Sequence, residues 1–400
     1  MAGAERLRQA FERGELLRPS AEVPNLVDLA RVIAAACGVD VRLTTRGARM
    51  LRDVIGEPRH LVLLLVDGLG LRMLEQRPGG SVLRRLLAME LRTVFPSTTA
   101  SAVTSLATGE WPAQHAVVGW WTHLPALDAA ATVLPFQRRS DERPLEELGI
   151  GAEQAFPVAP LLARATRDRL SLLPQSIANS TYSRYMSAGG ERLGYRTLRE
   201  AVATLLERVQ RAREPTFTYL YTSRVDAVAH DLGTSRPELW SEVAQIEEIV
   251  ESIALGLGPE SRLVVTADHG HLEAPIGLRH QLHNGSVLAG EQRIPPSGDP
   301  RSIYFHLREG ARERFREHFD ARFADEFALI TIEELEELEL LGPGPLTDET
   351  RRRVGDLVAI SLGPSVLGMP GITGGEKSLS LASHHSGLTP AEMRIPLVVA

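Results

Sequence analysis

The sequence predicts an α/β protein with a mainly parallel central sheet, helices on both faces of that sheet and inserted cap segments. Three short apolar runs are typical of buried strands: residues 60–66, 216–222 and 262–266. Stretches with helical periodicity lie between them, and strands that alternate with helices usually pair in parallel. With 400 residues, 43% of them hydrophobic and 24% charged, the chain can form one large domain with caps or two domains.

The N-terminal part of the chain is expected to be helical up to the first strand. Residues 1–57 read as two or three short helices, which form an extension packed on a core domain of residues 58–400. After the first strand we expect a loop, a helix and a short second strand. Because Pro96 cannot occupy a helix interior, the next helix is expected to begin near Thr98 or Thr99.

Two segments interrupt the alternation of strands and helices and predict cap excursions over the core. The first covers about residues 121–190 and contains many Pro and Arg residues with weak periodicity. The second covers about residues 275–370, where a strand at 301–307 precedes helices at 309–323 and 331–341.

Regular structure returns between the two excursions. Thr197 and Glu200 have the spacing of a capping box, which marks the start of a helix. A second amphipathic helix is expected over residues 241–255, directly before the apolar run 262–266. These helices complete the alternation that predicts the parallel sheet.

Carboxylate and imidazole side chains stand next to the predicted strands. Ligand sites of α/β sheets collect at strand ends, and aspartate with histidine is a donor set typical of zinc or a similar divalent ion. The pattern therefore predicts one site assembled by folding. Its candidate residues are Asp67 after the first run, Asp226 and His230 after the second, Asp268 and His269 after the third, and His384 and His385 before the last run at 395–399.

The segment 95–109 supplies a candidate nucleophile. Its small residues follow Pro96 and begin a helix, so a Thr hydroxyl at that start faces unpaired N–H groups and the positive end of the helix dipole. These groups favour an alkoxide and a phosphate oxygen. Taken alone, such a Thr is more often a simple helix cap, and only the neighbouring candidate ligands favour a catalytic role.

At these residues the chain resembles the alkaline phosphatase superfamily, and within it the type I phosphodiesterase and nucleotide pyrophosphatase family. Four elements match in order: the Asp-Gly after the first strand, the Phe-Pro-x-x-Thr segment that ends in Thr-Gly, the Asp-x-x-x-His pair and the Asp-His-Gly. A fifth, His-His-Ser-Gly-Leu-Thr-Pro, matches less tightly. The resemblance covers about residues 58–400 and implies an alkaline phosphatase-like catalytic domain.

The resemblance also implies two divalent metal ions and the residues that hold them. Zn²⁺ is the first expectation, with Mn²⁺ or iron as alternatives. A metal makes a hydroxyl nucleophilic near neutral pH, and two ions clamp the attacking and leaving oxygens of an in-line displacement. The expected route is a phospho-threonine intermediate that water hydrolyses. One ion would be held by Asp226, His230 and His385, the other by Asp67, Asp268, His269 and the nucleophile Thr99.

Several assignments stay open at this point. Thr98 competes with Thr99 as the nucleophile, and His384 competes with His385 as the last ligand. The other histidines are expected in turns or loops, including His271, a possible neighbour of the site. The leading function is cleavage of phosphodiester or pyrophosphate bonds in a small phosphate ester or nucleotide-like substrate. The alternatives are a phosphomonoesterase, a phosphosugar mutase and a catalytically silent binding domain.

Composition limits the partners and the compartment that we expect. A net charge of −7 gives no support for a nucleic acid polymer as partner. No apolar run approaches the length of a membrane span, and the N-terminus lacks the pattern of a secretory signal. The single cysteine, Cys37, fits a reducing compartment, so a cytoplasmic protein is expected. The oligomeric state is left undecided.

Overall fold

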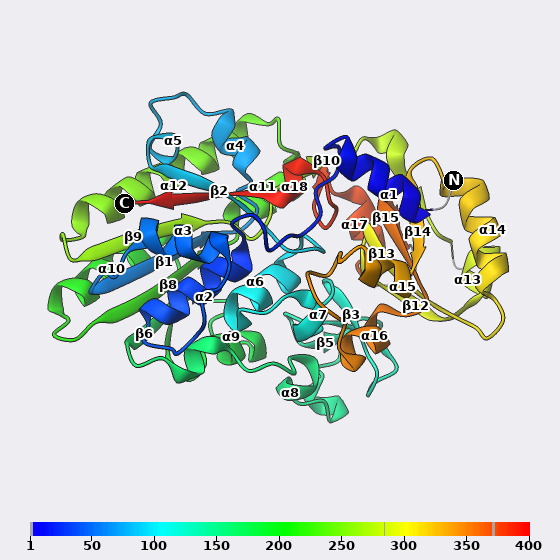
Figure 1. Ribbon diagram of the computed structural model, residues 1–400, viewed down its shortest axis with the longest axis horizontal. Coiled ribbons are helices and arrows are strands. Elements are labelled where there is room, and N and C mark those ends of the chain that lie inside the picture. The colour runs from blue at the N-terminus through cyan, green and yellow to red at the C-terminus, as the bar shows by residue number, and fades with distance from the viewer. Residues whose placement is uncertain (1–2, 284, 370–372) are drawn as a thin grey trace.

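The computed structural model describes residues 3–283, 285–369 and 373–400. Within them the chain builds two seven-stranded sheets, which Figure 1 shows side by side with α11 (Arg224–Leu232) and α18 (Pro390–Met393) between them. The first sheet is the predicted mainly parallel one. The second is antiparallel and was not predicted as a single sheet.

The central sheet confirms the predicted fold class. Strand β1 pairs in parallel with β8 and β9, and β6 pairs in parallel with β8 and β7, whereas β18 runs antiparallel to β2 and β9. The three predicted apolar runs are β1, β8 and β9, whose residues are nearly all buried because helices cover both faces. In spatial order the strands are β2 (Leu87–Arg92), β18 (Arg394–Val399), β9 (Ser261–Thr266), β1 (His60–Val66), β8 (Thr216–Thr222), β6 (Asp168–Pro174) and β7 (Glu191–Tyr195).

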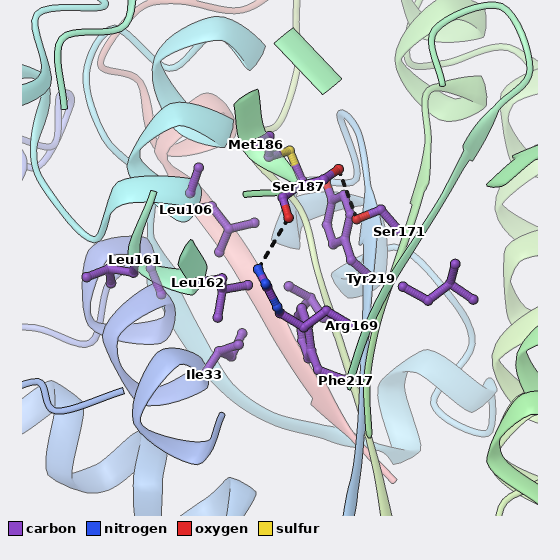
Figure 2. A pocket seen from close by; sticks show the side chains of 14 residues that line it. Ile33, Leu106, Leu161, Leu162, Arg169, Ser171, Met186, Ser187, Phe217 and Tyr219 are labelled. Carbon is purple, nitrogen blue, oxygen red and sulfur yellow. Dashed lines mark hydrogen bonds between the residues drawn. The ribbon is translucent and has the colours of Figure 1, made fainter. Parts of the chain in front are cut away.

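Neighbouring residues of β8 show that helices cover both faces. Phe217 and Tyr219 line a small crevice beneath α2 (Leu26–Ala36) and α6 (Thr99–Thr108), which Figure 2 shows. Thr218, between them, points the other way and accepts a hydrogen bond from Arg208 of α10 (Leu198–Arg211). The crevice has a volume of only about 30 Å³ and is mostly apolar, so it is a packing feature.

The second sheet combines both predicted excursions. Its strands pair antiparallel, and α14 (Arg312–Phe323) buries Phe315, Phe319 and Phe323 in the core beside it. α1 (Gly3–Glu12) lies along the edge strand β14 (Figure 1). The spatial order is β14 (Phe327–Thr331), β15 (Leu357–Ser361), β13 (Ser302–Leu307), β12 (Gln292–Asp299), β3 (Trp121–Leu124), β4 (Ala129–Thr132) and β5 (Gln137–Arg138).

The boundary of the first excursion differs from the sequence prediction. The predicted excursion extends to about residue 190, but β6 already belongs to the central sheet. Arg169 and Ser171 interrupt its apolar pattern and Pro174 ends it, so the strand signal was weak. The predicted extension at 1–57 and the second excursion at 275–370 include residues 1–2, 284 and 370, which lie outside the described part of the chain.

The remaining elements are mostly short and surround the two sheets. α12 begins at Pro237, four residues earlier than predicted, because proline fits the first turn of a helix. None of the described helices combines the length and apolarity that crossing a bilayer requires. These elements are α3 (Arg46–Ile55), α4 (Leu71–Glu75), α5 (Val82–Arg85), α7 (Pro112–His115), α8 (Ala152–Ala155), α9 (Thr181–Met186), α12 (Pro237–Gly256), α13 (Val287–Gly290), α15 (Ile332–Glu337), α16 (Asp348–Val354), α17 (Gly375–Ser380), β10 (Leu272–Glu273), β11 (Arg279–Gln281), β16 (Val366–Gly368) and β17 (Ser383–His384).

A buried ion pair ties the two sheets together. Arg301, directly before β13, donates from Nε and Nη2 to the two carboxylate oxygens of Glu392 in α18, at 2.7 and 3.0 Å, and both side chains are fully buried. Glu392 also accepts from the main-chain N–H groups of Gly387 and Thr389. This pair fixes the turn that follows His385 and leads into β18.

We expect Arg301→Met to destabilise the protein by about 3–5 kcal/mol, because it leaves the Glu392 carboxylate buried without its partner. The double variant Arg301→Met with Glu392→Gln should cost less than the two single changes added together. Urea unfolding of the full chain measures both effects. Strict additivity of the two single variants would contradict the coupling.

Candidate metal centre

The centre forms where β1, β8 and β9 end. Asp67 directly follows β1, and its N–H donates to Thr222 at the end of β8 while its carbonyl accepts from the N–H of Asp226. Gly68 lies at φ +77°, and a Cβ there would meet Asp226 Cα at 2.9 Å. Only glycine therefore allows the two loops to approach this closely.

One group of side chains surrounds His269 Nε2. This atom lies 3.2 Å from Thr99 Oγ1, 3.5 Å from Asp67 Oδ1 and 3.4 Å from Asp268 Oδ2. The hydroxyl of Thr99 also lies 3.4 Å from Asp67 Oδ1, and Tyr221 donates to the other Asp67 oxygen at 2.5 Å. Asp67, Asp268 and His269 thus form a group with the spacing of a metal site, and Thr99 lies beside it.

A second group surrounds Asp226 Oδ1. This oxygen lies 3.3 Å from His230 Nε2, 3.7 Å from His385 Nε2 and 3.0 Å from His271 Nε2. The two groups are adjacent, because the rings of His269 and His385 stack with centroids 3.7 Å apart. The structure therefore brings all the predicted ligands together around two neighbouring centres.

Each imidazole is held through its Nδ1 atom. Nδ1 of His230 lies 2.8 Å from the carbonyl of Ser383, and Nδ1 of His385 lies 3.0 Å from the carbonyl of Ser97. Nδ1 of His269 lies 3.2 Å from the carbonyl of Gly270. Because a carbonyl only accepts, Nδ1 carries the proton in each ring and Nε2 turns a free lone pair toward the centre, the usual arrangement of metal-binding histidine.

His271 follows the same rule through a side chain. Its Nδ1 lies 3.0 Å from Ser383 Oγ, and that hydroxyl donates its only proton to the carbonyl of Ala229 at 2.6 Å. His271 must therefore donate from Nδ1, which leaves an Nε2 lone pair facing the carboxylate of Asp226. Burial lowers the pKa of His271 to about 4, so the ring is neutral at pH 7.

The donor set fits divalent cations. Burial, together with the charges of Asp268 and Asp226, raises the pKa of Asp67 well above its usual range. Asp268 Oδ2 has no hydrogen-bond partner among the described residues. The Nε2 atoms of His230 and His385 face each other at 3.1 Å, and burial with the neighbouring imidazoles holds the pKa of His385 well below its usual range. Cations would balance these buried charges and lone pairs.

The structure distinguishes the neighbouring residues that the sequence left open. Thr99 Oγ1 lies beside His269, whereas Thr98 Oγ1 donates to Asp299 at 3.2 Å. His385 belongs to one of the groups with metal-site spacing, whereas His384 Nε2 is buried without a partner among the described residues and lies outside those groups.

Sequence reasoning missed the position of His271. It was expected in a loop, but the structure buries it against Asp226. The available signal was its place two residues after His269, with a glycine between them that lets this segment pass directly against α18. A Cβ at Gly270 would meet the carbonyl oxygen of Ala391 at 2.1 Å.

A cavity of about 390 Å³ opens in front of the centre. Its other walls include Trp121 at the start of β3, the preceding residue Trp120, and Lys377 from α17. Asp299 also lines it and accepts from the N–H of Trp120 at 3.0 Å, while burial raises its pKa to about 6. The cavity is large enough for a small organic phosphate with the scissile group at Thr99.

The α/β core thus places a candidate nucleophile at a helix start beside two adjacent carboxylate–imidazole groups, an arrangement that suits hydrolysis of phosphate esters. The model of the type I phosphodiesterase / nucleotide pyrophosphatase family matches residues 61–366, so the chain belongs to that family. It is thus a hydrolase that acts on phosphoester or pyrophosphate bonds. The match ends before the segment that carries His385.

Solved structures share the fold. The murine ectonucleotide pyrophosphatase/phosphodiesterase 5 has a TM-score of 0.63 at 16% identity, with 84% of this chain and 87% of that chain covered. The human enzyme has a TM-score of 0.64 at 14% identity, with 85% and 87% covered. An inactive variant of the murine enzyme in complex with AMP has a TM-score of 0.62 at 16% identity, with 84% and 87% covered. No curated protein matches the chain significantly.

We expect His271→Ala to weaken the binding of one divalent ion by about 10- to 100-fold, because His271 contacts Asp226 within the ligand group. Calorimetric titration of the metal-free protein with Zn²⁺ measures this change without relying on turnover. His280→Ala is the matched control, since His280 also pairs with a carboxylate, Glu326, away from the centre. Unchanged affinity in the His271 variant would contradict the assignment.

Proposed function

We propose that the protein hydrolyses phosphodiester or pyrophosphate bonds of small nucleotide-like substrates at a two-metal centre, through a phospho-threonine intermediate on Thr99. The observation that carries this proposal is the position of the Thr99 hydroxyl. It lies beside Asp67 and His269 and lines the same cavity as Asp226, His230 and His385. A phosphoryl group in that cavity would lie between the hydroxyl and the second group of ligands.

The proposed ions are Zn²⁺, because two carboxylate–imidazole groups suit it; Mn²⁺ and iron are the alternatives. When bound, they supply Lewis acidity and neutralise charge on the reacting phosphoryl oxygens. The proposed ligands are Asp226, His230 and His385 for one ion, with His271 added to that group, and Asp67, Thr99, Asp268 and His269 for the other.

The chain's own residues would position the hydroxyl for attack. Thr99 is the first residue of α6, so its hydroxyl lies at the positive end of the helix dipole. Asp67 accepts a hydrogen bond from the Thr99 hydroxyl and is itself held by Tyr221. As the Thr99 oxygen bonds to phosphorus, the bond to the leaving group breaks. Attack by water on the same phosphorus then releases phosphate product and restores the hydroxyl.

The alternatives within the superfamily make a different prediction for simple substrates. A diesterase should hydrolyse bis(p-nitrophenyl) phosphate with a higher kcat/KM than p-nitrophenyl phosphate. The opposite order would assign the protein to the phosphomonoesterases. A metal-loaded protein that hydrolyses neither compound nor a dinucleoside pyrophosphate would contradict the proposed function and favour a mutase or a silent binding domain.

We also propose that the protein works in the cytoplasm. The single cysteine supports this proposal, since one cysteine cannot form the intrachain disulfides that are common in oxidising compartments.

We expect Thr99→Ala to lower kcat on bis(p-nitrophenyl) phosphate by about three orders of magnitude or more, because it removes the attacking oxygen. Thr98→Ala is the matched control and should retain most of the activity, since Thr98 contacts Asp299 and not the ligand groups. Elemental analysis should find similar metal content in both variants. Full activity in Thr99→Ala would rule out the proposed nucleophile.

A further inference from the structure

One basic residue in the cavity is unusual for this chain. Of the 44 lysine and arginine residues in the sequence, Lys377 is the single lysine. It is in α17 and lines the cavity that also contains Thr99. A compact ammonium on a flexible stem binds an anion as a point charge and keeps contact while the anion moves, unlike the planar fork of arginine.

The exposure of the lining side chains shows which end of the cavity is its floor and which is its mouth. Thr99 is 8% exposed and therefore lies deep in the cavity, whereas Lys377 is exposed. An in-line displacement places the leaving group on the side of phosphorus opposite the attacking oxygen. A leaving group that departs from Thr99 would therefore move toward the mouth, where Lys377 lies.

The segment that carries Lys377 is fixed at both ends. A Cβ at Gly374 would meet the Trp121 ring at 2.7 Å, and Arg139 stacks on the same ring at 3.6 Å while donating to the carbonyl of Thr373. After the helix, the N–H of Ala382 donates to the carbonyl of His230 at 2.7 Å. The position of Lys377 is thus tied both to the aromatic wall and to the ligand helix α11.

No partner on the protein neutralises this ammonium within the described part of the chain. Two other acidic side chains line the cavity beside Asp226, but neither pairs with Lys377. Asp299 accepts hydrogen bonds from Thr98 and Trp120, and Asp231 forms no ion pair with the lysine. Among the described residues, no carboxylate oxygen lies within 4.0 Å of the Lys377 ammonium.

We propose that Lys377 binds a second phosphoryl group, the one in the leaving group of a pyrophosphate substrate. This inference rests on the proposed function and narrows it from phosphodiesters in general to phosphoanhydrides. When the anhydride bond breaks, its bridging oxygen leaves with the second phosphoryl group, which gains negative charge. An ammonium beside that group stabilises the charge as it develops. A simple aryl leaving group has no phosphoryl group to contact.

The first experiment compares two substrates. Diadenosine diphosphate carries a second phosphoryl group, and the p-nitrophenyl ester of thymidine 5′-monophosphate does not. We expect Lys377→Met to lower the ratio of kcat/KM for the pyrophosphate to that for the ester by about 10- to 100-fold, with the effect partly restored in Lys377→Arg. Arg199→Met removes an exposed positive charge on α10 and controls for the change in the protein's net charge. This variant should leave the ratio unchanged. An unchanged ratio in Lys377→Met would overturn the proposal.

The second experiment measures binding without turnover. Pyridoxal 5′-phosphate followed by borohydride modifies amines. Because Lys377 is the single lysine, peptide mass spectrometry can measure its modification separately from that of the N-terminal amine. On metal-loaded Thr99→Ala protein, inorganic pyrophosphate should protect Lys377 at a concentration at least tenfold lower than methyl phosphate. Equal protection by the two anions would overturn the second-phosphoryl site. If pyrophosphate protects Lys377 selectively but the wild-type protein hydrolyses neither substrate, the second-phosphoryl site is supported and the proposed function is rejected.

Discussion

The rest of the structure depends on the concentration of negative charge at the ends of three adjacent strands. Asp67, Asp226 and Asp268 are brought to one place because β1, β8 and β9 are neighbours in a parallel sheet and end at the same edge. Burial, together with repulsion from Asp268 and Asp226, raises the pKa of Asp67 well above its usual range. Imidazoles with inward lone pairs surround them, and the proposed cations would provide the opposing charge. The proposed chemistry therefore lies where the three strands of the parallel sheet end.

Several contacts outside the ligand groups keep this arrangement in register. The Arg301–Glu392 pair joins the second sheet to the turn after His385, and Ser383 holds both His230 and His271 through its carbonyl and its hydroxyl. The second sheet therefore has two structural roles at the site. It supplies the aromatic wall of the cavity and anchors the chain segments that return the last ligand to the centre.

The sequence predicted the parts of the molecule whose signals are local. The apolar runs of β1, β8 and β9 are continuous because both faces are buried, and each is followed by an acidic residue, so the fold class and the gathering of Asp67, Asp226 and Asp268 could be inferred. The sequence could not show that the two excursions join in one antiparallel sheet, because the pairing of distant strands such as β12 and β3 leaves no local sequence pattern. His271 was missed since its role depends on the close approach of Gly270 to Ala391 and on the hydroxyl of Ser383. Lys377 was overlooked for a similar reason, as only the folded chain places it beside Thr99.

The most direct test of this account is the number of divalent ions that the purified protein binds at equilibrium. Equilibrium dialysis of metal-free protein against Zn²⁺, followed by elemental analysis, should give about two ions per chain, and replacing Asp226 with Asn should reduce the number to about one. Binding of no ion, or an unchanged number in the Asp226→Asn protein, would show that the carboxylate cluster is not balanced by metal and would contradict the account.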